Sequence, residues 1–243
     1  MSDWAYPRWL AHRGAGKLAP ENTLAAFRLG ASHGYRMFEC DVKLSSDGVP
    51  FLLHDDTLNR TTNGQGVAGD QSWQALQQLD AGSWHSTPFA GEALPSLDEV
   101  AAFCIGGGFD LNIEIKPTSG TDQKTGEVVA QHAARLWQNE TRKPLLTSFK
   151  PDALQAARDA APQLPRGLLL HELWTGWLET GLMLGCQAII CNYKLWDTSS
   201  ATQAKSAGFK TLSYTVNDEA QAQRLQALGI DGIITDRVDL FKP

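Results

Sequence analysis

The chain has 243 residues, enough for one large α/β domain or two small ones, and 42% of them are hydrophobic, which suffices for a buried core. The formal net charge is −6 at pH 7 and Lys or Arg never exceed two in a row, which argues against a nucleic-acid partner because neutralising phosphates requires basic patches. No apolar run approaches ~18 residues, so we expect no membrane-spanning helix and no membrane insertion.

The N-terminal segment and the cysteines indicate a cytoplasmic protein. Residues 1–4 lack a charged segment followed by an apolar one, so no export signal is expected ahead of the first strand. No CxxC pair occurs among the four cysteines, which are Cys40, Cys104, Cys186 and Cys191. We therefore expect buried thiols in a reducing compartment rather than disulfides or a thiolate metal site.

Strands and helices alternate from the start of the chain. Residues 9–11 predict a short buried strand, and residues 20–33 predict a helix with Pro20 in its first turn. Segment 38–42 alternates apolar with acidic side chains, as a strand does. The Asp47-Gly48 dipeptide then predicts a hairpin turn that leads into an apolar return arm at 51–53.

Residues 56–96 interrupt this alternation. They are rich in glycine and proline, and they contain one helical stretch at 73–79. About 40 residues with so little regular structure is too long for an ordinary connection. Two tryptophans, Trp73 and Trp84, argue against a floppy surface loop. We expect an insertion after the second strand and its hairpin that covers the mouth of the site.

After the insertion the alternation is regular and gives the fold class. Strands are predicted at 111–116, 145–148, 167–170, 188–191, 211–215 and 232–235, with a helix before each, and Asn217 is expected to cap the last helix. Eight strands in about 240 residues predict a (β/α)8 TIM barrel, with residues 1–243 as one catalytic domain. A doubly wound open sheet is the alternative, weakened because no third glycine follows Gly14-Ala15-Gly16 at the nucleotide-binding spacing.

Ionisable residues concentrate where the first three strands end, which is where barrel enzymes carry their active sites. Side chains two positions apart share one face of a strand, so the acidic pair of the second strand points one way. His54 ends the return arm and is expected opposite Glu39 or Asp41, depending on loop length. The predicted rim residues are, in chain order, His12, Arg13, Glu39, Asp41, His54, Glu114 and Lys116.

This combination indicates metal-assisted cleavage of a phosphoester. Three carboxylates match a hard divalent cation such as Mg²⁺ or Ca²⁺ better than zinc. Two histidines that are not needed as ligands are free for acid–base catalysis, and two fixed cations suit an anionic substrate. Each residue alone has an ordinary structural explanation, but seven ionisable groups on one rim favour a shared function.

At these positions the sequence resembles the glycerophosphodiester phosphodiesterases, most of all the bacterial cytoplasmic enzyme, from about residue 8 to the end. The shared motifs are His12-Arg13-Gly14, Pro20-Glu21-Asn22-Thr23, Glu39-x-Asp41, His54-Asp55, Arg60-Thr61-Thr62-Asn63-Gly64, Glu114-Ile115-Lys116, Tyr214-Thr215-Val216-Asn217 and Thr235-Asp236. Arg237 departs from the pattern, which often has proline there. This departure affects the last turn and not the chemistry.

The resemblance implies a divalent-metal enzyme, with Mg²⁺ as the first choice and Ca²⁺ as the second. Its substrates would be deacylated phospholipid headgroups such as glycerophosphocholine and glycerophosphoethanolamine, cleaved to sn-glycerol 3-phosphate and an alcohol. The implied roles are metal binding by Glu39, Asp41 and Glu114, general acid–base catalysis by His12 and His54, and phosphate binding by Arg13 and Lys116. Headgroup preference and oligomeric state stay open.

Two other functions stay open at this point. A barrel that binds phosphate or metal without turnover is one, although binding alone needs neither histidine. The second is a lipid-acting phosphodiesterase or lyase at a membrane surface, with Trp174 and Trp177 in an exposed apolar rim. The acidic chain without a Lys/Arg cluster argues against it.

The nucleophile is expected to come from the substrate. No Ser, Thr or Cys stands beside a histidine at a matching strand end, so a covalent phosphoenzyme through these residues is not expected. The glycerol hydroxyl next to the phosphoester would attack instead. It would form a cyclic 1,2-phosphate, which water then opens while the two histidines exchange roles.

Overall fold

The computed structural model describes residues 6–243, and within them eight parallel strands close into a barrel. In order around the barrel they are β1 (Trp9–Ala11), β2 (Met37–Leu44), β4 (Asp110–Ile115), β5 (Leu145–Ser148), β6 (Arg166–Leu170), β7 (Ala188–Asn192), β8 (Lys210–Tyr214) and β9 (Gly232–Thr235). The barrel closes where β1 pairs with both β9 and β2. The predicted (β/α)8 barrel is confirmed, and the open sheet is excluded.

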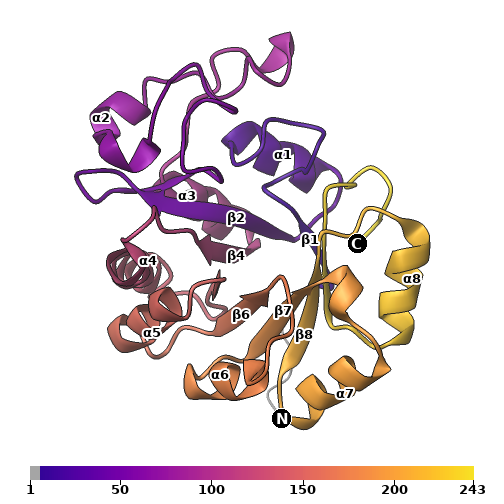
Figure 1. Cartoon of the computed structure of the whole chain (residues 1–243). Helices are drawn as coiled ribbons and strands as arrows, with labels where there is room; N and C mark the ends of the chain where they lie inside the picture. The colour runs from indigo at the N-terminus through magenta and orange to yellow at the C-terminus, as the bar shows by residue number, and fades with distance from the viewer. Residues whose placement is uncertain (1–5) are drawn as a thin grey trace.

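Helices surround the barrel on its outside (Figure 1). They are α1 (Leu24–Ser32), α3 (Leu97–Gly107), α4 (Asp122–Leu136), α5 (Pro151–Ala160), α6 (Trp177–Met183), α7 (Thr198–Ser206) and α8 (Glu219–Ala227). After β9 a turn at 238–240 replaces an eighth outer helix, and the Phe241 ring stacks on Trp9 at 4.6 Å. Within residues 6–243 no helix combines the length and apolarity needed to cross a membrane.

Side-chain alternation along the strands separates an inner from an outer core. On β2, Phe38, Cys40 and Val42 are buried against the surrounding helices. Met37, on the opposite face, joins a buried apolar cluster formed by residues of most of the strands, which fills the barrel interior. Glu39 and Asp41 continue the face of Met37 toward the carboxyl end of the strand. The barrel interior is therefore apolar in its depth and acidic at its mouth, where the strands end.

Among the predicted helix starts that are wrong, two involve residues that contact the site. The first helix begins at Leu24 rather than Pro20, because the Thr23 side chain caps it by accepting from the Ala26 backbone N–H. Asp218 rather than Asn217 caps α8. Asn217 instead hydrogen-bonds to Asp236.

The hairpin corrects the expected position of His54. The return arm β3 (Pro50–Leu52) pairs antiparallel to β2 with Val42 opposite Leu52. Continued further, this register would place His54 opposite Cys40, on the outer face, and not opposite either acidic residue. The strand stops at Leu52, however, and the chain bends so that His54 lines the barrel mouth.

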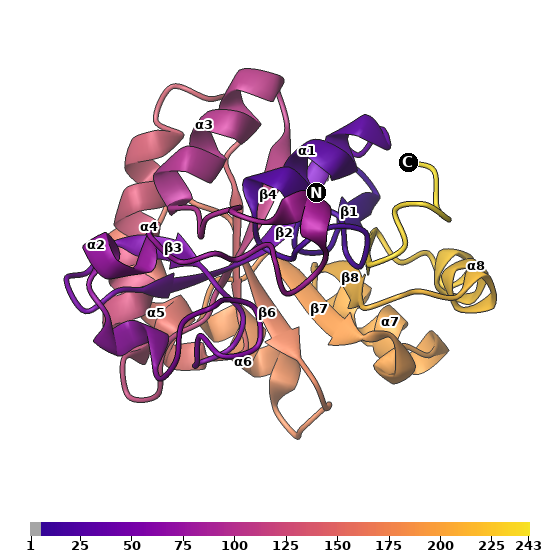
Figure 2. The same cartoon turned by 90° about the horizontal axis from the view of Figure 1, so that it is seen from above.

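The insertion at 56–96 has an apolar cluster of its own. Its one α-helix is α2 (Trp73–Leu76), and Leu58, Leu76 and Leu94 are buried against Phe51 of the hairpin. Figures 1 and 2 show it beside α1, at the side of the barrel formed by β2 and β3. Removing the whole insertion would expose this apolar surface, so its role is better tested with point substitutions.

Two helical glycines give a matched test of how tightly α1 is seated. A Cβ on Gly30 of α1 would lie 2.1 Å from the Gly14 carbonyl oxygen, whereas a Cβ on Gly106 of α3 meets nothing within 4 Å. We expect Gly30→Ala to destabilise the fold by about 1–3 kcal/mol through overpacking. Gly106→Ala should stabilise it by about 0.5–1 kcal/mol. Urea unfolding measures both, and equal effects would show that α1 is not held by this contact.

Candidate active site

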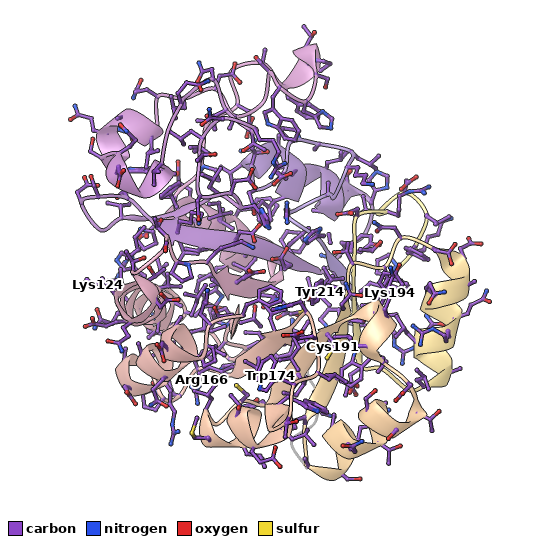
Figure 3. The ribbon with its side chains drawn as sticks, in the orientation of Figure 1. Lys124, Arg166, Trp174, Cys191, Lys194 and Tyr214 are labelled. Atoms are coloured by element: carbon purple, nitrogen blue, oxygen red, sulfur yellow. The ribbon has the colours of Figure 1, made fainter. Side chains whose placement is uncertain are left out.

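A cavity of about 180 Å³ opens at the carboxyl ends of the strands. Six of the seven predicted rim residues line it, and the seventh, Asp41, lies beside them and is 1% exposed. The rest of the wall is formed by apolar side chains such as Phe149 and Leu169, by Asn112 and Thr215, and by Tyr214 of β8, which Figure 3 labels. The structure thus brings all seven residues together.

The three carboxylates form the centre of the site. Asp41 and Glu114 are paired neighbours on β2 and β4, and Glu39 lies two positions before Asp41. One oxygen of each carboxylate lies within 4.8 Å of the others. Burial, then the charge of Asp41, raises the pKa of Glu39 to about 8 and raises the pKa of Glu114.

This donor set fits a hard divalent cation. All three ligands are carboxylate oxygens, and the four buried cysteines provide no competing thiolate, since none belongs to the cluster. The charge of Asp41 helps to raise the pKa values of Glu39 and Glu114, and a bound cation would offset this repulsion between carboxylates. The cluster of Glu39, Asp41 and Glu114 therefore fits a divalent cation.

Asp41 is held in its charged form by the two predicted phosphate ligands. Arg13 Nε lies 3.2 Å and Lys116 Nζ 3.4 Å from its two oxygens, and the Asn22 amide donates to it at 2.8 Å. Burial alone would raise the pKa of Asp41, but Arg13 and then Lys116 lower it below the usual range. Lys116 also donates to Glu114 at 2.9 Å.

His12 is oriented by a carboxylate from the other end of the chain. Its Nδ1 lies 2.6 Å from Asp236 Oδ1, and the second oxygen of Asp236 accepts from the Asn217 amide at 2.8 Å. This leaves Nε2 directed at the site, 3.7 Å from Glu39. Burial lowers the pKa of His12, but the bond to Asp236 and the charge of Glu39 outweigh it, so the pKa is raised.

His54 also lines the cavity and has an equivalent support. Its Nδ1 lies 2.8 Å from Asp55 Oδ1, and Arg60 donates to both oxygens of Asp55 at 2.7 and 2.9 Å. Arg60 also donates to Glu21, which in turn accepts from Arg13. Burial lowers the pKa of His54. Both imidazoles thus have one nitrogen engaged by a carboxylate and one free for chemistry.

Unusual backbone conformations bring the first loop close to the carboxylates. Arg13 has φ 51° and Asn22 has φ 60°, in the left-handed region that residues with a Cβ rarely adopt. The Arg13 backbone N–H donates to Glu39 at 3.1 Å, and Asn22 exchanges two hydrogen bonds with Asp41. Gly16 permits the loop to approach Asp236, because a Cβ there would lie 2.2 Å from its backbone.

The residues that support the site are predicted only as parts of motifs, except Asn217, which is expected to cap a helix. They are Glu21, Asn22, Asp55, Arg60, Asn217 and Asp236. The rule that polar residues at strand ends form the site, applied to the last strand as well as the first three, would have found Asp236. Asn22 and Asn217 give no such signal, because their roles depend on loop conformation.

The comparisons with known proteins now decide the family. The profile described as "Glycerophosphoryl diester phosphodiesterase family" matches residues 12–240. The chain belongs to this family. A glycerophosphodiester phosphodiesterase of Caldanaerobacter subterraneus subsp. tengcongensis is 33% identical over 235 residues, covering 93% of each chain. By these matches the protein is an enzyme of the glycerophosphodiester phosphodiesterase class.

Solved structures of the family have the same fold. An Oleispira antarctica phosphodiesterase in complex with the product sn-glycerol-3-phosphate is 34% identical, with a TM-score of 0.89 over 95% of this chain and 93% of that chain. A glycerophosphodiester phosphodiesterase from Agrobacterium tumefaciens is 28% identical, with a TM-score of 0.81 over 97% of this chain and 98% of that chain.

Asp236 offers a test of how the first histidine is positioned. We expect Asp236→Asn to lower kcat by about 10²–10⁴-fold, because an amide no longer fixes the imidazole in the orientation and charge state that acid–base catalysis requires. Asp239→Asn, in the turn that follows, removes only an exposed ion pair with Arg237 and is the control. If the two variants retain similar kcat in a diester assay, Asp236 does not position His12.

Proposed function

We propose that the site hydrolyses glycerophosphodiesters such as glycerophosphocholine and glycerophosphoethanolamine to sn-glycerol 3-phosphate and an alcohol. The observation that supports this most directly is the arrangement of two carboxylate-supported histidines around three clustered carboxylates. The product bound in the Oleispira antarctica structure supports the glycerol side of the substrate. Bond cleavage between phosphorus and the headgroup oxygen follows from these products.

Glu39, Asp41 and Glu114 would hold a divalent cation, with Mg²⁺ as the first choice and Ca²⁺ as the second. Bound there, the ion would supply positive charge that acidifies a substrate hydroxyl and polarises the phosphoryl group. Mg²⁺ is preferred because three protein ligands leave positions for water and substrate, which is how that ion is usually held.

The two histidines would carry out the proton transfers. In the first step one of them removes the proton from the glycerol hydroxyl beside the phosphoester, and the other protonates the departing alcohol. A cyclic 1,2-phosphate forms. Water then opens it with the roles exchanged. The hydrogen bonds to Asp55 and Asp236 keep each ring oriented, so that Nε2 rather than Nδ1 takes part.

Arg13 and Lys116 would bind the phosphoryl oxygens in both steps. Both side chains line the cavity and pair with its buried carboxylates, and within residues 6–243 the buried Nε of Arg13 has no hydrogen-bond partner although it lies 3.2 Å from Asp41. Positive charge fixed in advance stabilises the negative charge that develops as the phosphoester is cleaved.

The structure removes one argument for an enzyme that acts on lipids at a membrane surface. Trp177 is 8% exposed and belongs to a buried cluster under α6, so it does not form an apolar rim. For location, we infer the cytoplasm, in keeping with the four buried free cysteines.

The metal proposal predicts that a chelator abolishes release of glycerol 3-phosphate and that added Mg²⁺ restores it. Glu114→Gln should weaken the metal affinity measured by titration, with little loss of thermal stability, because the amide keeps the volume and loses only the charge. Glu127→Gln on α4, a half-exposed side chain that does not line the cavity, is the control. Full activity in excess chelator would contradict the metal assignment.

The substrate-assisted route predicts a strict need for the glycerol 2-hydroxyl. A 2-deoxy analogue of glycerophosphocholine should bind and yet release choline at least about 10²-fold more slowly, which is the smaller end of an acid–base contribution. Choline release measured side by side with the natural diester decides this. Equal rates would indicate direct attack by water in place of a cyclic intermediate.

A further inference from the structure

A second cavity, of about 430 Å³, lies against the active site on the side of the insertion. His12 and Arg13 line both cavities, so the two are adjacent across these side chains. The outer wall of the second cavity is formed by Trp84 and His85, which come from the insertion. The proposed hydrolysis places no reacting group in this cavity and gives neither ring a role.

The two rings are held rigidly although they lie near the surface. Trp84 is 39% exposed, and its indole N–H donates to the Ala81 carbonyl oxygen at 2.8 Å. His85 Nε2 lies 3.1 Å from the carbonyl oxygen of Lys17, which ties the insertion to the first loop. The rings of Trp84 and His85 meet edge to face at 5.7 Å, and the ring of His85 meets Phe89 in the same way at 5.4 Å.

The position of the cavity matches the departing alcohol. In phosphoryl transfer the attacking and leaving oxygens lie roughly in line on opposite sides of phosphorus. The acidic cluster and His54 border the inner cavity, where the attacking glycerol hydroxyl is proposed to lie. A leaving group placed on the side of phosphorus away from His54 would extend past His12 toward the second cavity, whose lining includes His12 and not His54.

We propose that this second cavity is the headgroup subsite and that Trp84 selects headgroups that carry an alkylated ammonium, such as choline. This assignment deepens the proposed function and rests on it. An indole face attracts a quaternary ammonium through its ring quadrupole, and a ring fixed in advance loses little entropy on binding. When the bond from phosphorus to the headgroup oxygen breaks, its electron pair stays on that oxygen, which takes a proton from His12 Nε2.

The cavity lining carries Arg13 and Lys17 as cations against Glu21 and Asp236 as carboxylates, so its charges are balanced and do not exclude a cationic guest. Glu21 and Asp236 contribute carboxylates, although both are already paired, with Arg13 and with His12 respectively. Lys17 is the one lysine of the lining, and it is exposed, so water and salt screen its charge. A headgroup bearing a carboxylate, such as serine, would be favoured instead if Lys17 dominated recognition.

The decisive comparison uses two substrates that differ only in charge. Glycerophosphocholine and its carbon isostere, the 3,3-dimethylbutyl ester, have the same shape, but only the first carries a cation. We expect the unmodified enzyme to favour the choline ester in kcat/KM by roughly 2- to 30-fold, the range of a cation–π contact. Trp84→Leu should bring this ratio close to one, while Trp84→Phe should retain part of it.

The controls separate recognition from folding and from the proposed function. Gln78→Ala, exposed on the insertion, should keep the ratio of the unmodified enzyme, and thermal unfolding checks that each variant is folded. An equal kcat/KM for the two esters, an equal loss for both in Trp84→Leu, or a preference for the serine ester would each overturn this subsite assignment alone. Failure to cleave any glycerophosphodiester would overturn the proposed function and the subsite with it.

Discussion

The structure depends on the burial of three carboxylates in the mouth of the barrel. Glu39, Asp41 and Glu114 are each less than a tenth exposed and close together, an arrangement that like-charge repulsion and lost hydration both oppose. Cations and hydrogen-bond donors from neighbouring segments, chiefly Arg13 and Lys116, offset this repulsion and the lost hydration. The divalent ion proposed to bind the same oxygens would complete this compensation, so that metal binding and fold stability would depend on the same residues.

Residues far apart in the chain orient the imidazoles of His12 and His54. His12 follows the first strand and its carboxylate partner, Asp236, follows the last, and these strands are adjacent because the barrel closes. His54 has its partner next to it in sequence, and Arg60 from the insertion holds that partner in place. Closure of the barrel therefore positions one histidine of the proposed acid–base pair, and Arg60 of the insertion supports the other through Asp55.

The insertion contributes to the site in a way that its composition did not reveal. Its apolar cluster is buried on the hairpin, and its Trp84 and His85 form the wall of a cavity that shares His12 with the active centre. The hydrogen bond from His85 to the carbonyl of Lys17 fixes that wall to the first loop. If Trp84 binds the headgroup as proposed, substitutions in the insertion would change headgroup recognition and leave the proposed acid–base and metal-binding residues unchanged.

The sequence by itself determined the barrel and the seven ionisable residues at its rim, because strand and helix periodicities are local and barrel sites lie at strand ends. It misplaced the starts of α1 and α8 and the register of His54, since a cap or a bend depends on where one side chain finds its partner. Only the tertiary structure decided that Asn22 supports Asp41, that Asp236 orients His12, and that Trp84 stands beside the site. Each of these is a contact between segments far apart in the chain or held by left-handed backbone, and no local pattern encodes such a contact.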